Sequence, residues 1–438
     1  YQKLTYKILK GLSSMKKKYG IISNFDDLCG NAAYSMSLEK ILSNDFDIHR
    51  LDVTNITKIY DSKRIHSIIN NVAEGSKECD YVNVQLEVGL YGNNFISGYN
   101  NIKKIIKNVK PKKGLSITFH RVFNKPRSNE NIFLKHLISL KLISLLRYVR
   151  RELQCRVLNR KYLTLVKVAI KKNSKIIVHT KRDLNYLKLT IGDIPNIIYH
   201  PIIFSNEISN SKITDYTRYS PALAELDPDI PTVGVFGFIS EYKNIEIVIN
   251  SCKTSEANLI IFGQIHPSAR YENPFLTNKS SYIEKLNRMA LGEFPNSNNI
   301  FKLPQNILNS IDKNISKVTD LKNKGQSKGE VRFMSGLKDN EFFAAMKMVD
   351  LIVVPYWETG QSGSGIVSLA IQSKSRLILS DTESFYEIAD EVDGWVPIID
   401  PANISQLSNL ITQYKTIPKT NGFKNHNEDT LRKAYTEF

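Results

Sequence analysis

Residues 349–381 read VDLIVVPYWETGQSGSGIVSLAIQSKSRLILSD and contain the clearest structural pattern of the sequence. Within them, 351–354 is a short apolar run closed by Pro355, which predicts a buried strand. A loop of glycine and serine follows, and 366–371 carries apolar residues at helical spacing. Residues 376–379 begin another strand, so the stretch predicts a β-α-β unit.

The loop between the first strand and the helix has the composition of a phosphate-binding turn. Small residues let a ligand approach the backbone, and a helix N-terminus offers backbone N–H groups and a positive dipole end. The residues that form the end of this loop and the start of the helix are Ser362, Gly363, Ser364, Gly365 and Ile366. We therefore expect a phosphate to bind there.

Length, composition and charge restrict the class of protein. A chain of 438 residues is long enough for two or three domains, and 42% hydrophobic residues is ordinary for a globular protein. The four cysteines are far apart without metal-type spacing, which predicts no disulfide framework and favours a reducing cytoplasm. The net charge of +17 favours a membrane surface, nucleic acid or phosphorylated substrates as partners; the alternative is solvated lysines.

Targeting signals are missing from the sequence as given. It has no run of 18 or more apolar residues and no signal-peptide pattern, so we expect no transmembrane helix. The chain starts at Tyr1 rather than Met, which we interpret as one module of a longer protein with further domains upstream. Residues 1–18 are basic and weakly amphipathic, and we expect a linker helix there.

The N-terminal half predicts an α/β domain whose strands end in polar or small residues. After an expected strand at 19–24, a turn that includes Gly30 and Asn31 leads into an expected helix at 35–42. The small residues of this turn would let a ligand approach the backbone. An ordinary β-α turn is the alternative.

Two later strands of this half end in candidate site residues. Glu87 follows a strand within 80–92, and the strand at 115–120 ends in His120, beside Arg121. Because the carboxyl ends of strands line the crevice of an open α/β sheet, we expect Glu87 and His120 to face a ligand, with Arg121 near phosphate or acceptor. A surface glutamate and a structural histidine are the alternatives.

Residues 135–172 are the most basic stretch, with eleven Lys or Arg and one acid, Glu152. Interleaved Leu, Ile and Val predict a helix with an apolar side. A basic helix of this kind is typical of binding to an anionic membrane surface. The alternative is a core-facing helix with a charged outer side.

The remaining segments predict connections. Residues 209–230 are polar and irregular, and we interpret them as an interdomain linker. Asp227 and Asp229 form an Asp-x-Asp pair there, but Pro228 interrupts it and no strand precedes it, so we expect no metal site. Residues 264–330 predict an exposed insertion, in which His266 and Arg270 follow a strand end, and 409–438 predict a terminal helix.

In their order along the chain, these stretches resemble glycosyltransferase family 4. Residues 231–244, 259–263 and 331–350 are similar to the strands and turns that precede the family's donor loop, and the resemblance covers most of 18–410. It implies an α/β fold of the GT-B type, with two Rossmann-like doubly wound domains facing each other across a cleft. The implied parts are an acceptor-side domain at 19–208, a donor domain at 231–408, and a helix at 409–438 that crosses back to the first domain.

The resemblance also implies a reaction and a set of residues. It implies retaining transfer from a UDP- or GDP-linked sugar without a metal or other cofactor, with a cation and a helix N-terminus compensating the leaving diphosphate. The implied catalytic residues are His120, Lys243 and Glu358, and those near the acceptor are Glu87 and Arg121. Donor contacts are implied for Gly30, Asn31, Gly237, Lys243, Gly263, Ser362, Gly363, Ser364, Gly365, Ile366 and Glu387.

Two positions differ from the family pattern. Phe238 stands where an arginine is common, and Leu369 stands where a second glutamate is common. We expect a glycosyltransferase of bacterial surface polysaccharide or O-antigen synthesis, acting on a glycan or lipid-linked glycan at the cytoplasmic face of the cell membrane. The alternatives are a non-catalytic GT-B module that binds a sugar nucleotide or partner, and a nucleic-acid-binding protein argued from charge alone.

Overall fold

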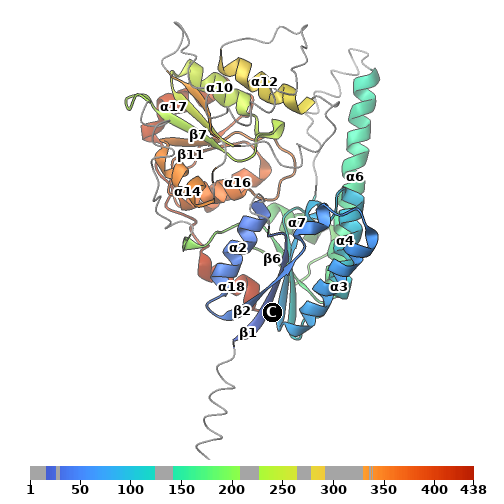
Figure 1. Cartoon of the computed structure of the whole chain (residues 1–438). Helices are drawn as coiled ribbons and strands as arrows, with labels where there is room; N and C mark the ends of the chain where they lie inside the picture. The colour runs from blue at the N-terminus through green and yellow to red at the C-terminus, as the bar shows by residue number, and fades with distance from the viewer. Residues whose placement is uncertain are drawn as a thin grey trace, which may run out of the picture. The chain divides into compact units, whose positions relative to one another are not determined.

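The computed structural model describes residues 16–25, 30–123, 142–207, 226–263, 278–291, 329–334, 337 and 339–438. The chain groups into two compact units (Figure 1). The N-terminal unit comprises Tyr1–Ser205, Gly360–Gly363 and His426–Phe438, and the C-terminal unit comprises Asn206–Thr359 and Ser364–Asn425. No helix in these described ranges combines the length and apolar composition that crossing a membrane requires.

The N-terminal unit is built on a parallel sheet of six strands in the order β2-β1-β3-β4-β5-β6. The strands are β1 (Lys17–Ser23), β2 (Phe46–Asp52), β3 (Tyr81–Leu86), β4 (Gly114–Phe119), β5 (Lys175–Val178) and β6 (Ile197–Tyr199). The inner strands are short and mostly apolar, as is typical of parallel strands covered on both faces.

Helices cover both faces of this sheet (Figure 1). Those of the unit are α2 (Gly30–Leu42), α3 (Ser62–Glu78), α4 (Phe95–Asn108), α6 (Leu142–Lys171), α7 (Lys181–Ile191) and α18 (Glu428–Thr436), with 3-10 turns η1 (Thr54–Thr57) and η2 (Val88–Leu90). Ile69, Ile105 and Leu165 bring α3, α4 and α6 into one core with the strands. Tyr435 of α18 bonds Tyr34 of α2 on the opposite face, 3.1 Å between hydroxyls.

The C-terminal unit repeats this plan with the parallel strand order β12-β11-β10-β7-β8-β9. Its strands are β7 (Thr232–Phe236), β8 (Asn258–Phe262), β9 (Val331–Met334), β10 (Leu351–Val354), β11 (Leu377–Ser380) and β12 (Ile398–Ile399). Its helices are α10 (Ile245–Thr254), α12 (Asn278–Ala290), α14 (Asp339–Met348), α15 (Gly365–Gln372), α16 (Glu383–Glu391) and α17 (Ile404–Thr412), with 3-10 turns η4 (Glu241–Lys243) and η5 (Tyr414–Thr416).

Each sheet has a point at which the strand order reverses. In the N-terminal unit the reversal lies between β1 and β3, and in the C-terminal unit it lies between β7 and β10. The strand order of the C-terminal unit is the Rossmann order. Ligands of open α/β sheets bind outside the carboxyl ends of the strands at such points. The segments that leave β7 and β10 are therefore the first place to look for a site.

Most expected elements are present, and two expectations were wrong. The strand at 351–354 is confirmed, and the strand expected at 115–120 is present as β4. The helix expected at 35–42 begins at Gly30, so Gly30 and Asn31 belong to its first turn rather than to a loop.

The terminal helix expected over 409–438 is also corrected. Instead of one helix, the chain forms α17, η5 and α18, separated by an irregular segment. Pro418 restricts the residue before it, and Gly422 has φ +106, so a helix cannot continue through them. The expected linker helix at 1–18 lies almost entirely outside the described residues, as do most of the insertion at 264–330, including His266 and Arg270, and most of the 209–230 linker.

Candidate functional site

The turn after β7 requires glycine at Gly237 for two reasons. Its φ of +92° lies in the left-handed region, where a side chain is strained. A Cβ at this position would also overlap the Nζ atom of Lys243 and lie 3.3 Å from the side chain of Ile366. The glycine thus lets an amine from η4 and the first turn of α15 meet at the carboxyl end of β7.

Lys243 is a buried cation with few neighbours to hold its charge. Its side chain is 3% exposed, its Nζ atom donates a hydrogen bond to the carbonyl of Phe236 at 3.1 Å, and it lies 5.4 Å from the ring centroid of Tyr356. Burial lowers the pKa of Lys243 to about 7. An anion placed beside this amine would restore its ordinary pKa and be held by its charge.

The Gly-Ser loop ends in the N-terminus of α15, as expected. Ser364 is the N-cap, and its hydroxyl accepts a hydrogen bond from the Val367 N–H at 3.4 Å. A helix start leaves further N–H groups directed outward, here those of Gly365 and Ile366, with the positive end of the dipole behind them. Since both the Ile366 side chain and the Lys243 amine lie against Gly237, the N-terminus of α15 and this amine belong to the same site.

Gly263, at the end of β8, belongs to the same place. A Cβ there would overlap the carbonyl of Gly237, and its N–H donates to the Met334 carbonyl at 2.9 Å. Four predicted donor residues therefore come together in the C-terminal unit: Gly237, Lys243, Gly263 and Ile366. We call them, with Ser364 and Gly365, the Lys243 site.

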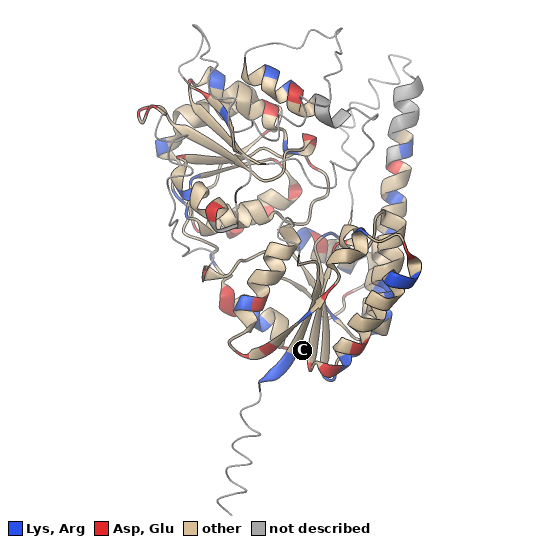
Figure 2. Ribbon diagram, in the orientation of Figure 1, with Lys and Arg blue, Asp and Glu red and all other residues tan. Residues whose placement is uncertain are grey.

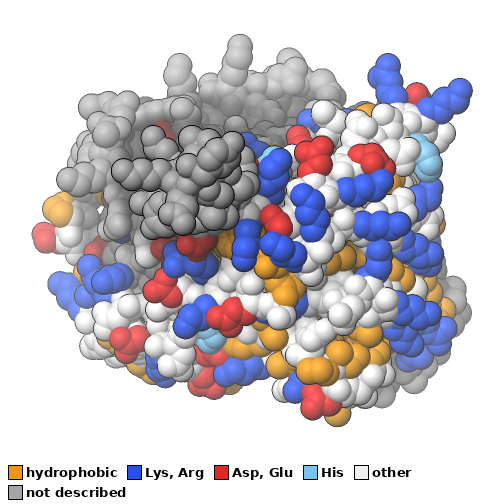
Figure 3. Space-filling model, turned by 90° about the horizontal axis from the view of Figure 1, so that it is seen from below, with side chains coloured by type: hydrophobic (Ala, Val, Ile, Leu, Met, Phe, Trp, Pro, Cys, Tyr) orange, Lys and Arg blue, Asp and Glu red, His pale blue; other side chains and the backbone are white. Residues whose placement is uncertain are grey.

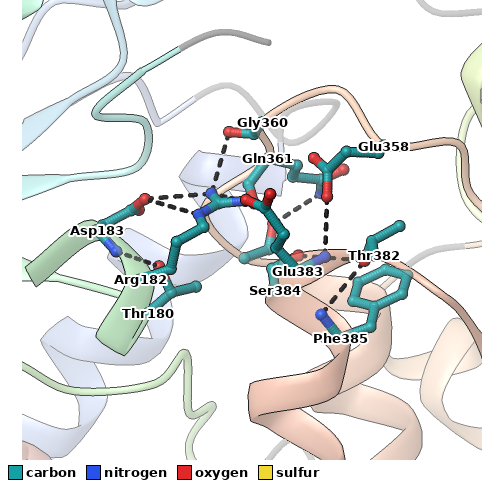
Figure 4. A network of polar contacts seen from close by, with 11 residues as sticks. Thr180, Arg182, Asp183, Glu358, Gly360, Gln361, Thr382, Glu383, Ser384 and Phe385 are labelled. Carbon is teal, nitrogen blue, oxygen red and sulfur yellow. Dashed lines mark hydrogen bonds and ion pairs between the residues drawn. The ribbon is translucent and has the colours of Figure 1, made fainter. Parts of the chain in front are cut away.

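Glu358 and Glu387 lie near helix α16. One carboxylate oxygen of Glu358 accepts a hydrogen bond from the Glu383 N–H at 2.9 Å, next to the N-cap Thr382 (Figure 4). This contact stabilises the helix N-terminus, as a negative charge does there. Glu387 lies within α16 with one carboxylate oxygen buried. The catalytic role of Glu358 and the donor contact of Glu387 stay predictions.

The first half of the Gly-Ser loop packs with the N-terminal unit. Arg182 of α7 donates from Nη2 to the carbonyls of Gly360 and Gln361, at 3.2 and 2.9 Å, and pairs with Asp183 at 3.1 Å (Figure 4). The guanidinium also lies 4.5 Å from the ring centroid of Phe123. We call this arrangement the Arg182 clamp.

Two more loop residues contact the residues around the clamp. The Asp183 carboxyl is fully buried, and burial raises its pKa while Arg182 and the Ser362 hydroxyl lower it. Gly363 lies against Ile202 and the Cβ atom of His179. Ser362 and Gly363 are thus packed into the N-terminal unit, whereas Ser364 onward groups with the C-terminal unit.

Histidines follow three neighbouring strands of the N-terminal sheet: His120 after β4, His179 after β5 and His200 after β6. His120 Nε2 lies 2.7 Å from Gln85 Oε1, and the His120 and His179 rings are 5.1 Å apart. His179 Nδ1 donates to the His200 carbonyl at 3.0 Å, which leaves Nε2, buried and without a hydrogen-bond partner among the described residues, as an acceptor.

Both of these rings are neutral at physiological pH. Burial, with His179 nearby, lowers the pKa of His120, and burial lowers that of His179 to about 4. Sequence reasoning selected His120 and missed His179, although the run KIIVH ends in the same way as LSITFH. The strand-end rule would have found it had it been applied to every strand.

Glu87, Arg121 and Tyr162 form a second polar group at this edge of the sheet. The Tyr162 hydroxyl donates to Glu87 Oε1 at 3.5 Å, and the positive charge of Arg121 lowers the pKa of Tyr162, against a larger rise caused by burial. The two residues predicted to contact the acceptor therefore lie near one tyrosine of α6. Gly30 and Asn31 open α2, but the turn at 26–29 lies outside the described residues.

The described residues contain no group of three or more His, Cys, Asp or Glu placed to hold a metal ion. In the pair that resembles a metal motif, Asp227 Oδ1 accepts a hydrogen bond from the Asp229 N–H at 2.9 Å. Cys79, Cys155 and Cys252 are free thiols, and Cys29 lies outside the described residues.

Solved structures of known proteins share this fold. HepE of Anabaena, solved with UDP and glucose, has a TM-score of 0.53 at 11% identity over 96% of this chain and 92% of its own. The sucrose-phosphate synthase of Thermosynechococcus elongatus has 0.53 at 12% over 96% and 92%, and a UDP-forming trehalose-phosphate synthase of Burkholderia vietnamiensis has 0.55 at 11% over 93% and 92%.

The chain matches no family model and no curated protein sequence. The structural likeness nevertheless confirms the expected fold class, since both units are doubly wound α/β domains and the chain has the GT-B fold. Membership of glycosyltransferase family 4 in particular stays a prediction.

Proposed function

We propose that this protein is a glycosyltransferase that moves a sugar from a nucleotide-sugar donor to a glycan or lipid-linked glycan. The observation that carries the proposal is the Lys243 site. It combines a buried amine, a required glycine and a capped helix start at the switch point of a Rossmann sheet. No catalytic metal is needed where a lysine and a helix dipole face the diphosphate.

The proposed reaction is a single displacement at the anomeric carbon of the donor sugar. The bond between the anomeric carbon and the diphosphate oxygen breaks, and the nucleoside diphosphate leaves with the electron pair. The acceptor oxygen bonds to the same carbon, and its proton passes to the leaving phosphate. We propose retention of configuration by front-face attack, with His120, Glu87 and Arg121 orienting sugar and acceptor, and Glu358 and Glu387 contacting the donor.

The donor that we propose is a UDP-linked sugar. The neighbours solved with UDP or UDP-glucose, and the UDP-forming synthase, favour a UDP-linked sugar over a GDP-linked one. A hexosyl transfer in bacterial surface polysaccharide or O-antigen synthesis, at the cytoplasmic face of the cell membrane, remains our proposal for the role in the cell.

A non-catalytic module that binds a sugar nucleotide is the second candidate. Phe238 and Leu369 stand where the family commonly has an arginine and a glutamate. The Glu358 carboxylate accepts a hydrogen bond from the backbone at the start of α16. Such a module would keep the Lys243 site but lack turnover. The two candidates therefore differ in one measurable quantity, the release of nucleoside diphosphate.

The test combines binding and turnover. We expect UDP or UDP-glucose to raise the thermal unfolding temperature of the wild type with or without EDTA, and Lys243→Met to abolish the shift. Lys415→Met, at an exposed lysine of the same unit, is the matched control and should keep it. UDP release dependent on added glycan acceptor supports the enzyme, binding without release supports the module, and no shift with any nucleotide sugar contradicts both.

A further inference from the structure

Helices α4 and α6 lie side by side on one face of the N-terminal sheet, and a groove runs between their second halves. The groove has a volume of about 660 Å³. Its lining is Lys103 and Lys107 from α4, Thr164, Lys167, Val168 and Lys171 from the end of α6, and Lys172 directly after it. We call it the lysine groove.

The lysine groove is lined by five lysines. Among the described residues no carboxylate forms an ion pair with any of its five lysines. Lys172 donates to the Val109 carbonyl at 3.1 Å, and burial together with the charge of Lys110 lowers its pKa. A groove of this kind favours a ligand with several negative charges, such as phosphate groups.

In their first halves, α4 and α6 carry exposed aliphatic residues on the sides on which the lysines of the groove lie. We call them the aliphatic patch: Ile96 of α4 is 64% exposed, and Val149, Leu153 and Val157 of α6 are 42%, 56% and 52% exposed. Lys167 and Lys171 lie 18 residues after Val149 and Leu153, about five helical turns, so all four point to one side of α6. Arg160 lies between the two groups and is exposed.

Basic residues gather along this part of the protein. Figure 2 shows Lys and Arg along α6 and on the helices beside it. Figure 3, a view from below, shows blue side chains concentrated along the side on which α4 and α6 lie in Figure 1. The lysine groove and the aliphatic patch point to one side of the two helices, so both can contact a lipid surface when the helices lie flat on it, with the lysines at the phosphates and the aliphatic residues at the acyl boundary.

We propose that the outer face of α4 and α6 docks on an anionic membrane surface. The lysine groove takes headgroup phosphates, and the aliphatic patch enters the headgroup and acyl boundary. Nucleic acid is disfavoured because the exposed residues of the patch are aliphatic, whereas single strands are bound by stacking on aromatic rings. A soluble phosphate is disfavoured as well, because it would make no contact with the aliphatic patch.

The lysine groove and the Lys243 site are built on different units. Helices α4 and α6 return antiparallel to the strands they connect, so their second halves lie at the amino edge of the N-terminal sheet. The Lys243 site lies at the carboxyl edge of the sheet in the other unit. Changes to the lysine groove should therefore leave nucleotide binding unaltered, which separates this inference from the proposed function.

The test is flotation of the full chain with two kinds of vesicle. One contains phosphatidylcholine alone, and the other contains phosphatidylcholine and phosphatidylglycerol in equal parts. We expect binding only to the mixed vesicles, weakening as salt rises. Lys167→Gln/Lys171→Gln should weaken it about 30-fold, and Leu153→Ser/Val157→Ser at least about tenfold. Lys40→Gln/Lys433→Gln carries the same charge change at exposed lysines of α2 and α18, on the opposite face of the N-terminal sheet, and should bind as the wild type.

Three results would overturn the proposal. The first is an absence of binding to mixed vesicles, or equal binding by all variants. The second is tight calorimetric binding of inorganic tripolyphosphate together with vesicle binding that ignores the Leu153/Val157 change, which would assign the groove to a soluble phosphate. The third is lysine-dependent binding of single-stranded RNA without vesicle binding.

Discussion

The depressed pKa of Lys243 makes donor binding depend on pH. Below about pH 7 the amine of the free protein is protonated, and above this value it loses its proton. Because the diphosphate binds the charged form, we expect UDP-glucose affinity to be constant below about pH 7 and to fall as the pH rises, by at most about tenfold per unit. Calorimetric titration from about pH 6 to 9 measures this.

Lys243→Arg is the control for this prediction. An arginine keeps its charge throughout the range, so its affinity should not fall with pH. A fall of the same size in Lys243→Arg would mean that another group controls binding.

His179 makes the N-terminal unit sensitive to acid. Above pH 6.5, its ordinary pKa, neither state holds the proton and the ring contributes nothing to pH dependence. Between 6.5 and about 4 the unfolded chain binds a proton that the folded protein does not, so the free energy of unfolding falls by about 3 kcal/mol in total.

His179→Asn should reduce this loss, because an asparagine amide can still donate to the His200 carbonyl and does not titrate. Urea unfolding of both proteins at about pH 7.5 and 4.5 gives the comparison. Equal losses in the two proteins would show that His179 binds its proton in the folded state.

At the scale of elements, the Arg182 clamp connects α7 to the loop that leads into α15. A lysine at position 182 keeps the charge but cannot hold two carbonyls and a carboxylate with one planar group. We expect Arg182→Lys to weaken UDP-glucose binding about tenfold, since the loop would be held less firmly at the helix start. The measurement is a calorimetric titration together with the Michaelis constant for the donor.

Arg64→Lys provides the matched control, because Arg64 is an exposed residue of α3 with a side chain 79% exposed. Its donor affinity should equal that of the wild type. If Arg182→Lys lowers the turnover rate while donor affinity stays the same, the clamp does not position the donor loop.

The elements show what local sequence can and cannot predict. Pro355, the glycines and Ser364 mark the strand, loop and helix, and Gly237 and Lys243 were found because each has a local signal. The Arg182 clamp has none, since Arg182 and Gly360 are 178 residues apart. The start of α2 was misplaced because glycine and asparagine favour turns, whereas here they form the first turn of a helix whose buried residues begin at Ala32.

At the scale of the molecule, the family resemblance implied both the fold class and a C-terminal helix that returns to the first domain, but not the contacts that this helix makes. Tyr435 completes the core of the N-terminal unit: its hydroxyl lies 2.8 Å from Thr118 Oγ1 and 3.1 Å from the Tyr34 hydroxyl, and its carbonyl accepts from Tyr19. A single sequence contains no pattern that pairs residue 435 with strands four hundred residues earlier.

Tyr435→Ala should therefore destabilise the N-terminal unit, although the residue is distant from it in sequence. The side chain is fully buried, so we expect a loss of about 3–5 kcal/mol in the free energy of unfolding. Hydrogen exchange resolved by segment measures it: protection should fall in β1, β3 and β4 and be kept in β7, β8 and β10. A uniform loss in both units would contradict the assignment.

The return of α18 to the first sheet also has a consequence for the timing of synthesis. The sixth strand of the N-terminal sheet ends at Tyr199, but the ring that closes its core is Tyr435. At about 5–20 residues per second a ribosome needs roughly 12–50 s to cover that interval. During this time the N-terminal unit stays incomplete while the C-terminal unit is made, so its core stays open to solvent for longer than the end of its last strand would suggest.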